Sequence, residues 1–107
     1  MAFKRKKVGS YRWPVTVSSP ADGGGSEKET IDLVFKRIKR TELEGVKDNV
    51  QLLERVIEGW SNYLDESDKE IPFSDAALKE LLQDTAFVPA AAKAYWESLQ
   101  GGAQAGN

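Results

Sequence analysis

The sequence predicts an α+β domain, in which an N-terminal β-hairpin packs on a small C-terminal bundle of about three helices. Two observations carry this prediction. Apolar and polar residues alternate in two stretches before residue 40, whereas apolar residues recur every three or four positions in the stretches that follow. Strands that come before the helices, rather than between them, favour an α+β arrangement over a parallel sheet.

The first strand is predicted over residues 11–17. Pro14 cannot donate a backbone hydrogen bond to a neighbouring strand, so we expect this strand at an edge of the sheet. Its apolar face is formed by alternate residues, namely Tyr11, Trp13, Val15 and Val17.

The second strand is predicted over residues 30–38, where Ile31, Leu33 and Phe35 share one face. Residues 18–28 contain three consecutive glycines and should form a flexible connection, whose length leaves the register of the hairpin open. A two-stranded hairpin is marginally stable in water. It must therefore pack on helices or take strands from another copy of the chain.

The first helix is predicted between Thr41 and Leu64. Gly45 moves its expected start to Asp48, a suitable N-cap, and Gly59 weakens its last turn. The apolar positions of the helix are spaced by three or four, at Val46, Val50, Leu53, Ile57, Trp60 and Leu64.

A charged loop over residues 65–72 should separate this helix from two shorter ones. Ser74 is the expected N-cap of the second helix. Pro89 suits the first turn of the third helix, which should end at Gly101. A chain of 107 residues is long enough for one domain. We assign residues 1–10 to a basic N-terminal arm, 11–100 to the domain and 101–107 to a flexible tail.

The composition argues against enzymatic chemistry. The chain has no histidine and no cysteine, which excludes imidazole bases, thiolate nucleophiles and Cys/His zinc sites. The acidic loop has Lys69 where a calcium loop needs a ligand, and no Gly-Lys-Ser/Thr follows the three glycines. We therefore predict no catalytic, cofactor-binding or metal-binding residue. The sequence also contains no apolar stretch long enough for a membrane span or a signal peptide.

Charge is distributed unevenly along the chain. Residues 1–40 carry a balance of +6, and residues 41–107 carry −8. Such a molecule can associate head to tail with further copies, and the alternative is that both charged regions are solvated faces. Nucleic-acid binding is not expected, because the basic cluster is confined to the N-terminus and the sequence pI is about 5.2.

The large aromatic side chains are the candidate residues for binding a partner protein. Most of them would also suit a small hydrophobic core, but a chain of this size has more than it can bury completely. The candidates are Trp13, Phe35, Trp60, Tyr63, Phe73 and Trp96.

Several segments together resemble the tail assembly chaperones of long-tailed bacteriophages. The N-terminal half resembles them in the segments at residues 13–17 and 33–37. The centre does so in the order of Gly59-Trp60, the acidic loop and Ile71-Pro72-Phe73-Ser74. The C-terminal part does so at Leu78, Leu81-Leu82, Ala94-Tyr95, Leu99, Gly101 and Asn107, so that the resemblance covers nearly the whole chain.

This resemblance implies that the protein binds the phage tape measure protein and keeps it soluble while the tail tube assembles. The tail tube protein is a second candidate partner, and self-association of the chain is a third. The protein would act in the cytoplasm of the infected bacterium and would be absent from the mature virion. The alternative is a structural tail or head–tail connector component that remains in the virion.

Overall fold

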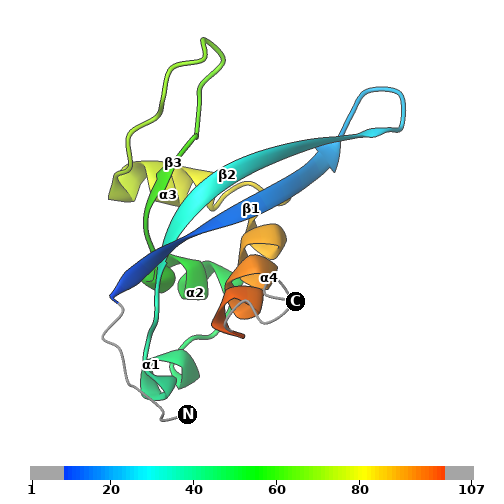
Figure 1. The fold of residues 1–107 in the computed structure, drawn as a ribbon. Coiled ribbons are helices and arrows are strands. Elements are labelled where there is room, and N and C mark those ends of the chain that lie inside the picture. Colours follow the sequence, from blue (N-terminus) through cyan, green and yellow to red (C-terminus); the bar gives the residue numbers. More distant parts are fainter. Residues whose placement is uncertain (1–8, 101–107) are drawn as a thin grey trace, which may run out of the picture.

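The computed structural model describes residues 9–100 and shows an α+β fold (Figure 1). The expected tail at 101–107 and residues 1–8 of the expected basic arm lie outside the described residues. The described elements, in chain order, are β1 (Ser10–Pro20), β2 (Ser26–Lys36), α1 (Arg40–Glu44), α2 (Asn49–Val56), β3 (Ile57–Ser61), α3 (Asp75–Leu81) and α4 (Phe87–Leu99).

The predicted hairpin is present, and both of its strands are longer than predicted. β1 pairs antiparallel with β2 in an unbroken register from Ser10 opposite Lys36 to Pro20 opposite Ser26. The connection is therefore only residues 21–25, where Gly23 and Gly24 have φ values of 91° and 97° that favour glycine. The sheet order β1-β2-β3 places β1 at an edge, as Pro14 predicted.

The prediction of one helix from Thr41 to Leu64 was wrong. This stretch forms α1, α2 and then β3, which adds to the free edge of β2. The register shifts between Val34 and Phe35, so that Ile57 pairs with Phe35 while Trp60 pairs with Leu33. This β-bulge turns two residues three positions apart toward the same face of the sheet. Their spacing therefore imitates a helical repeat.

The remaining helix boundaries follow the sequence signals. The Asp48 carboxylate accepts a hydrogen bond from the Gln51 amide at 2.8 Å, and the Ser74 hydroxyl accepts one from the Ala77 amide at 3.1 Å. Both are N-caps, as predicted. Pro89 lies in the first turn of α4. These caps fix where α2 and α3 begin.

The hydrophobic core lies between one face of the sheet and the helices that cover it (Figure 1). Leu33 and Phe35 of β2 are completely buried there, together with Tyr95 of α4. The Tyr95 ring makes an edge-to-face contact with Phe35, at 5.1 Å between centroids, and its hydroxyl donates to the Lys36 carbonyl at 3.1 Å. These contacts hold α4 against the sheet.

Two segments extend away from this core (Figure 1). The hairpin arm comprises residues 16–30, the far part of β1 and β2 and their connection. The loop arm comprises residues 62–72, between β3 and α3, and its two sides are joined by an isolated bridge between Leu64 and Glu70. Among residues 9–100, no helix is long and apolar enough to cross a membrane.

Candidate functional site

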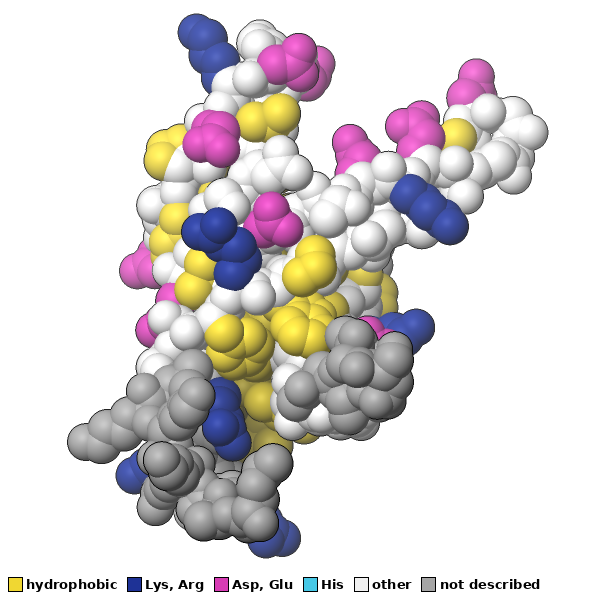
Figure 2. Space-filling view, viewed as in Figure 1, with side chains coloured by type: hydrophobic (Ala, Val, Ile, Leu, Met, Phe, Trp, Pro, Cys, Tyr) yellow, Lys and Arg dark blue, Asp and Glu magenta, His cyan; other side chains and the backbone are white. Residues whose placement is uncertain are grey.

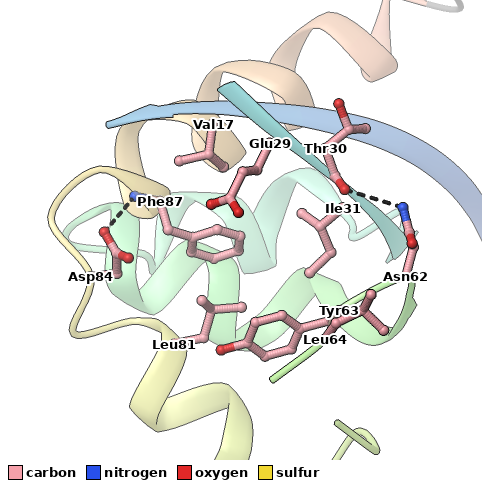
Figure 3. A pocket seen from close by; sticks show the side chains of 10 residues that line it. All are labelled: Val17, Glu29, Thr30, Ile31, Asn62, Tyr63, Leu64, Leu81, Asp84 and Phe87. Atoms are coloured by element: carbon pink, nitrogen blue, oxygen red, sulfur yellow. Dashed lines mark hydrogen bonds between the residues drawn. The ribbon is translucent and has the colours of Figure 1, made fainter. Parts of the chain in front are cut away.

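A cleft of about 300 Å³ lies between the two arms (Figure 3). The hairpin arm forms one wall, the loop arm forms the other, and the end of α3 and the start of α4 close the bottom. Its lining consists of Val17, Glu29, Thr30, Ile31, Asn62, Tyr63, Leu64, Leu81, Asp84 and Phe87. The cleft thus brings together residues from four separate parts of the chain.

The floor of the cleft is apolar and belongs to the core. Ile31, Leu81 and Phe87 are buried members of the core cluster, and each also lines the cleft. Leu64 lies on the loop-arm wall and is 43% exposed, although it is a large aliphatic residue. An exposed apolar surface of this kind gains free energy when a second apolar surface covers it, by roughly 25 cal/mol per Å² removed from water.

The charged groups that line the cleft are both acidic. Glu29 lies opposite Val17 and two positions before Ile31, so it occupies the core-facing side of β2. Figure 3 shows its side chain directed into the cleft. It makes no ion pair with any residue between 9 and 100. A carboxylate therefore stands where the strand pattern would place an apolar residue.

Asp84 has a structural role as well as its place in the lining. Its Oδ1 accepts hydrogen bonds from the amides of Ala86 at 2.8 Å and Phe87 at 3.2 Å, and so orders the turn that leads into α4. Burial raises the pKa of the Tyr63 hydroxyl, and the negative charges of Glu80 and Asp84 raise it further. Glu80 and Asp84 therefore place negative charge close to the Tyr63 hydroxyl.

The loop arm is held in place by an aromatic cluster at its base. The Trp60 ring makes edge-to-face contacts with Tyr63, at 5.1 Å between centroids, and with Phe73, at 4.8 Å. The Trp60 indole Nε1 donates to the Ile71 carbonyl at 2.8 Å. These contacts connect Trp60 of β3 to Tyr63 near the start of the loop arm and to Ile71 near its end.

A polar contact also links the two arms directly. The Asn62 side-chain Nδ2 donates to the Thr30 carbonyl at 3.3 Å (Figure 3). Asn62 has a φ of 63°, a conformation that asparagine tolerates better than most residues. At the tip of the loop arm, the Asp65 carboxylate accepts from the amides of Ser67 and Lys69. This acidic loop therefore uses Asp65 to order its own backbone.

The six aromatic candidates from the sequence have different positions. Tyr63 lines the cleft, whereas Trp60 and Phe73 support it from behind. Trp13 is half-buried against the core, and Trp96 is 43% exposed on α4, outside the cleft. Phe35 was a poor candidate.

Phe35 lies in the core and cannot contact a partner in the folded domain. Its exposed fraction is 0%, because Tyr11 and Tyr95 both contact its ring and the helices cover the sheet at this point. A partner could reach it only if the core opened. The sequence reasoning did not identify Glu29, Asp84 or the residues of the floor. For Glu29 a signal existed, because it continues the core-facing alternation that begins at Ile31.

A second groove lies between β1 and α4. Its volume is about 430 Å³, and it is lined by small and polar residues, which are Pro14, Thr16, Ser18, Ala86, Pro89, Ala90, Lys93, Ala94 and Glu97. It lacks the large buried apolar side chains that form the floor of the cleft between the arms. We therefore take that cleft as the candidate site.

The cleft offers mainly apolar contacts to a partner. Within residues 9–100, no group of three or more acidic side chains is placed to hold a metal ion. What the cleft presents is apolar surface bordered by carboxylates and backbone polar groups. No protein-family model, curated protein or solved structure matches this chain.

Proposed function

We propose that this protein is a tail assembly chaperone of a long-tailed bacteriophage, which binds the tape measure protein and keeps it soluble while the tail tube assembles. The observation that carries the proposal is the cleft, in which the exposed Leu64 and the partly buried Tyr63 and Val17 line two projecting arms above an apolar floor. A chaperone that holds an unassembled chain needs such a surface and enough charge elsewhere to remain soluble itself.

The shape of the cleft suits one segment of an extended or helical client. Binding of an amphipathic helix in a groove buries its apolar face and leaves its polar face in water. Leu64 and Tyr63 on the loop arm would contact one side of such a segment, and Val17 on the hairpin arm would contact the other. The client would leave when tube subunits cover it, so the chaperone would act in the host cytoplasm and be absent from the virion.

The proposal can be tested by co-expression with the tape measure protein of the same phage. The expected result is that the client moves from the insoluble to the soluble fraction and co-purifies with the chaperone. The Leu64→Ser variant should weaken this effect, because Leu64 lines the cleft. Leu99→Ser is the matched control, because Leu99 is also partly exposed, at 37%, but lies outside the cleft.

Two outcomes would contradict the proposal. The first is a client whose solubility does not depend on the wild-type chaperone. The second is an equal loss with Leu64→Ser and Leu99→Ser, which would show that the cleft is not the binding site.

A structural component of the tail or connector is the second candidate. One observation favours it: β1 is an edge strand of 11 residues, and strands of this kind can pair with another subunit in an assembled ring. Mass spectrometry of purified virions separates the two functions, because only a structural component remains in the particle.

A further inference from the structure

The described part of the chain has a basic end and an acidic end. The basic end is where β1 begins, because Ser10 pairs with Lys36 and the basic run of residues 36–40 follows directly. The acidic end comprises the two arms, and Figure 2 shows acidic side chains gathered on both. The loop arm alone has four acidic residues and one lysine between positions 65 and 70. The two ends therefore carry opposite charge.

The two carboxylates that line the cleft at the acidic end can each accept further hydrogen bonds or form an ion pair. Glu29 has no cationic partner among the described residues, and the two hydrogen bonds to Asp84 both use one of its two oxygens. The floor beneath them is apolar. A segment that fits such a cleft combines positive side chains with apolar ones, since long basic side chains can lay their aliphatic stems along apolar surface.

The chain itself contains a segment of this composition. Residues 1–8 include four consecutive basic residues, Lys4 to Lys7, flanked by Phe3 and Val8, and they include no acidic residue. This segment precedes β1 and so is attached at the basic end.

We propose that residues 1–8 of one copy bind in the cleft of a second copy. The basic side chains would pair with Glu29 and Asp84, and Phe3 or Val8 would cover the apolar floor. The contact goes beyond the proposed function, because it describes the protein without its client.

Residues 1–8 are attached at the end of the molecule that lies opposite the cleft, so binding in the cleft of a second copy is favoured over binding in their own. From Ser10 to Val17, β1 rises by about 23 Å, at roughly 3.3 Å per residue. To reach its own cleft, the segment would have to reverse direction at Gly9 and extend almost fully, since eight residues span at most about 28 Å. A neighbouring copy imposes no such reversal.

A contact between two different surfaces does not close on itself. In such a pair one copy still offers a free cleft and the other a free N-terminal segment, so further copies can add to give chains or rings. The same cleft would then serve both the neighbouring copy and the client. Client binding would release the N-terminal segment, and copies would separate as the client is loaded.

The experiment is sedimentation velocity on the full chain over a range of concentrations, at low and high salt. The wild type should associate as concentration rises, and high salt should weaken the association because it screens the charges. The Glu29→Gln/Asp84→Asn double variant should weaken it by roughly tenfold or more, the change expected for the loss of about 1.4 kcal/mol. The side-chain oxygen of asparagine can accept the same two hydrogen bonds, so the turn before α4 should keep its shape.

Two further variants make the test specific. The control Glu54→Gln/Glu97→Gln removes the same charge from exposed positions outside the cleft and should associate as the wild type does. The second test reverses charges. Glu29→Lys alone, and a variant with Lys4 to Lys7 each changed to Glu, should both be monomeric, and mixing the two should restore association.

Three results would overturn the inference. The first is a wild-type protein that remains monomeric at roughly millimolar concentration in low salt. The second is association that survives in the Glu29→Gln/Asp84→Asn variant, and the third is an equal loss in the control. None of these measurements includes the client. A negative result therefore does not contradict the chaperone function, which the co-expression experiment tests separately.

Discussion

Replacing Trp60 with phenylalanine should release the loop arm while leaving the rest of the fold in place. Trp60 is not in the lining of the cleft, but its indole Nε1 holds the Ile71 carbonyl at 2.8 Å. The substitution removes this hydrogen bond and shortens the ring that contacts Tyr63 and Phe73. The arm should then open more often, because this bond ties Ile71, near the end of the arm, to β3.

The magnitude follows from the burial of the bond. Leaving a buried carbonyl unsatisfied costs about 1–3 kcal/mol, and a partly buried one lies at the low end because water can reach it. The Trp60–Ile71 bond is partly buried, so we expect a loss of about 1–2 kcal/mol. That corresponds to roughly a 5–30-fold increase in the population of the open arm.

Native-state hydrogen exchange measures this change directly. The Ile71 amide donates to the Tyr63 carbonyl at 2.8 Å, so it reports opening of the loop arm. The Phe35 amide lies in the core of the sheet and reports global unfolding. In Trp60→Phe, exchange at Ile71 should accelerate much more than exchange at Phe35. Client binding should weaken in parallel.

Trp13→Phe is the matched control. Trp13 is also half-buried, but its indole makes no hydrogen bond with a residue in the described range 9–100. It should therefore leave Ile71 exchange unchanged. Equal acceleration at Ile71 and Phe35 in Trp60→Phe would refute the reasoning, because Trp60 would then stabilise the whole domain and not the arm.

Three further predictions concern stability. Phe35→Ala should lower the free energy of unfolding by about 3–5 kcal/mol, which is a large share of the total stability of a small domain. Trp96→Ala should lower it by less than about 1 kcal/mol, because Trp96 is partly exposed. Urea denaturation of both variants measures this difference. Gly24→Ala should destabilise the hairpin by about 1–2 kcal/mol, because the φ of Gly24 is 97°. Gly25→Ala is the control and should not destabilise it, because the φ of Gly25 is outside the left-handed range. Equal denaturation midpoints for the two variants would contradict this prediction. Burial raises the pKa of all three tyrosines, so the fold favours the neutral phenol. The stability that the buried tyrosines contribute should be fully present below about pH 10 and should fall as the pH rises above that value. Denaturation midpoints measured together with phenolate absorbance test this. A midpoint that rises with pH over this range would contradict the prediction.

Local patterns determined most of the secondary structure. The alternation at Tyr11–Val17 and Ile31–Phe35 specified two strands and the side of each that faces the core, because the period of two is a property of the strand itself. Asp48 and Ser74 marked helix starts because a cap acts on amides only two or three residues away. Such signals are complete within a short window, so they can be read without knowledge of the fold.

Tyr63 was the only lining residue of the cleft among the six aromatic candidates. The other lining residues come from β1, β2, the segment after β3, α3 and the start of α4, and nothing in any one of these segments indicates that they meet. Phe35 shows the opposite error. Its aromatic ring was compatible with a surface or a core, and only the packing of α4 on the sheet decided between them.

The third strand shows why tertiary structure was needed. Ile57 and Trp60 have the spacing of a helix, and Gly59 was the one local sign against it. This segment forms a strand because the unpaired edge of β2 offers it backbone hydrogen bonds. A bulge then turns the side chains of Ile57 and Trp60 toward the core. Pairing between distant segments is a property of the assembled chain. The sequence therefore determined the pieces and their apolar faces, while the assembled sheet decided the direction of the loop arm and, with it, the cleft.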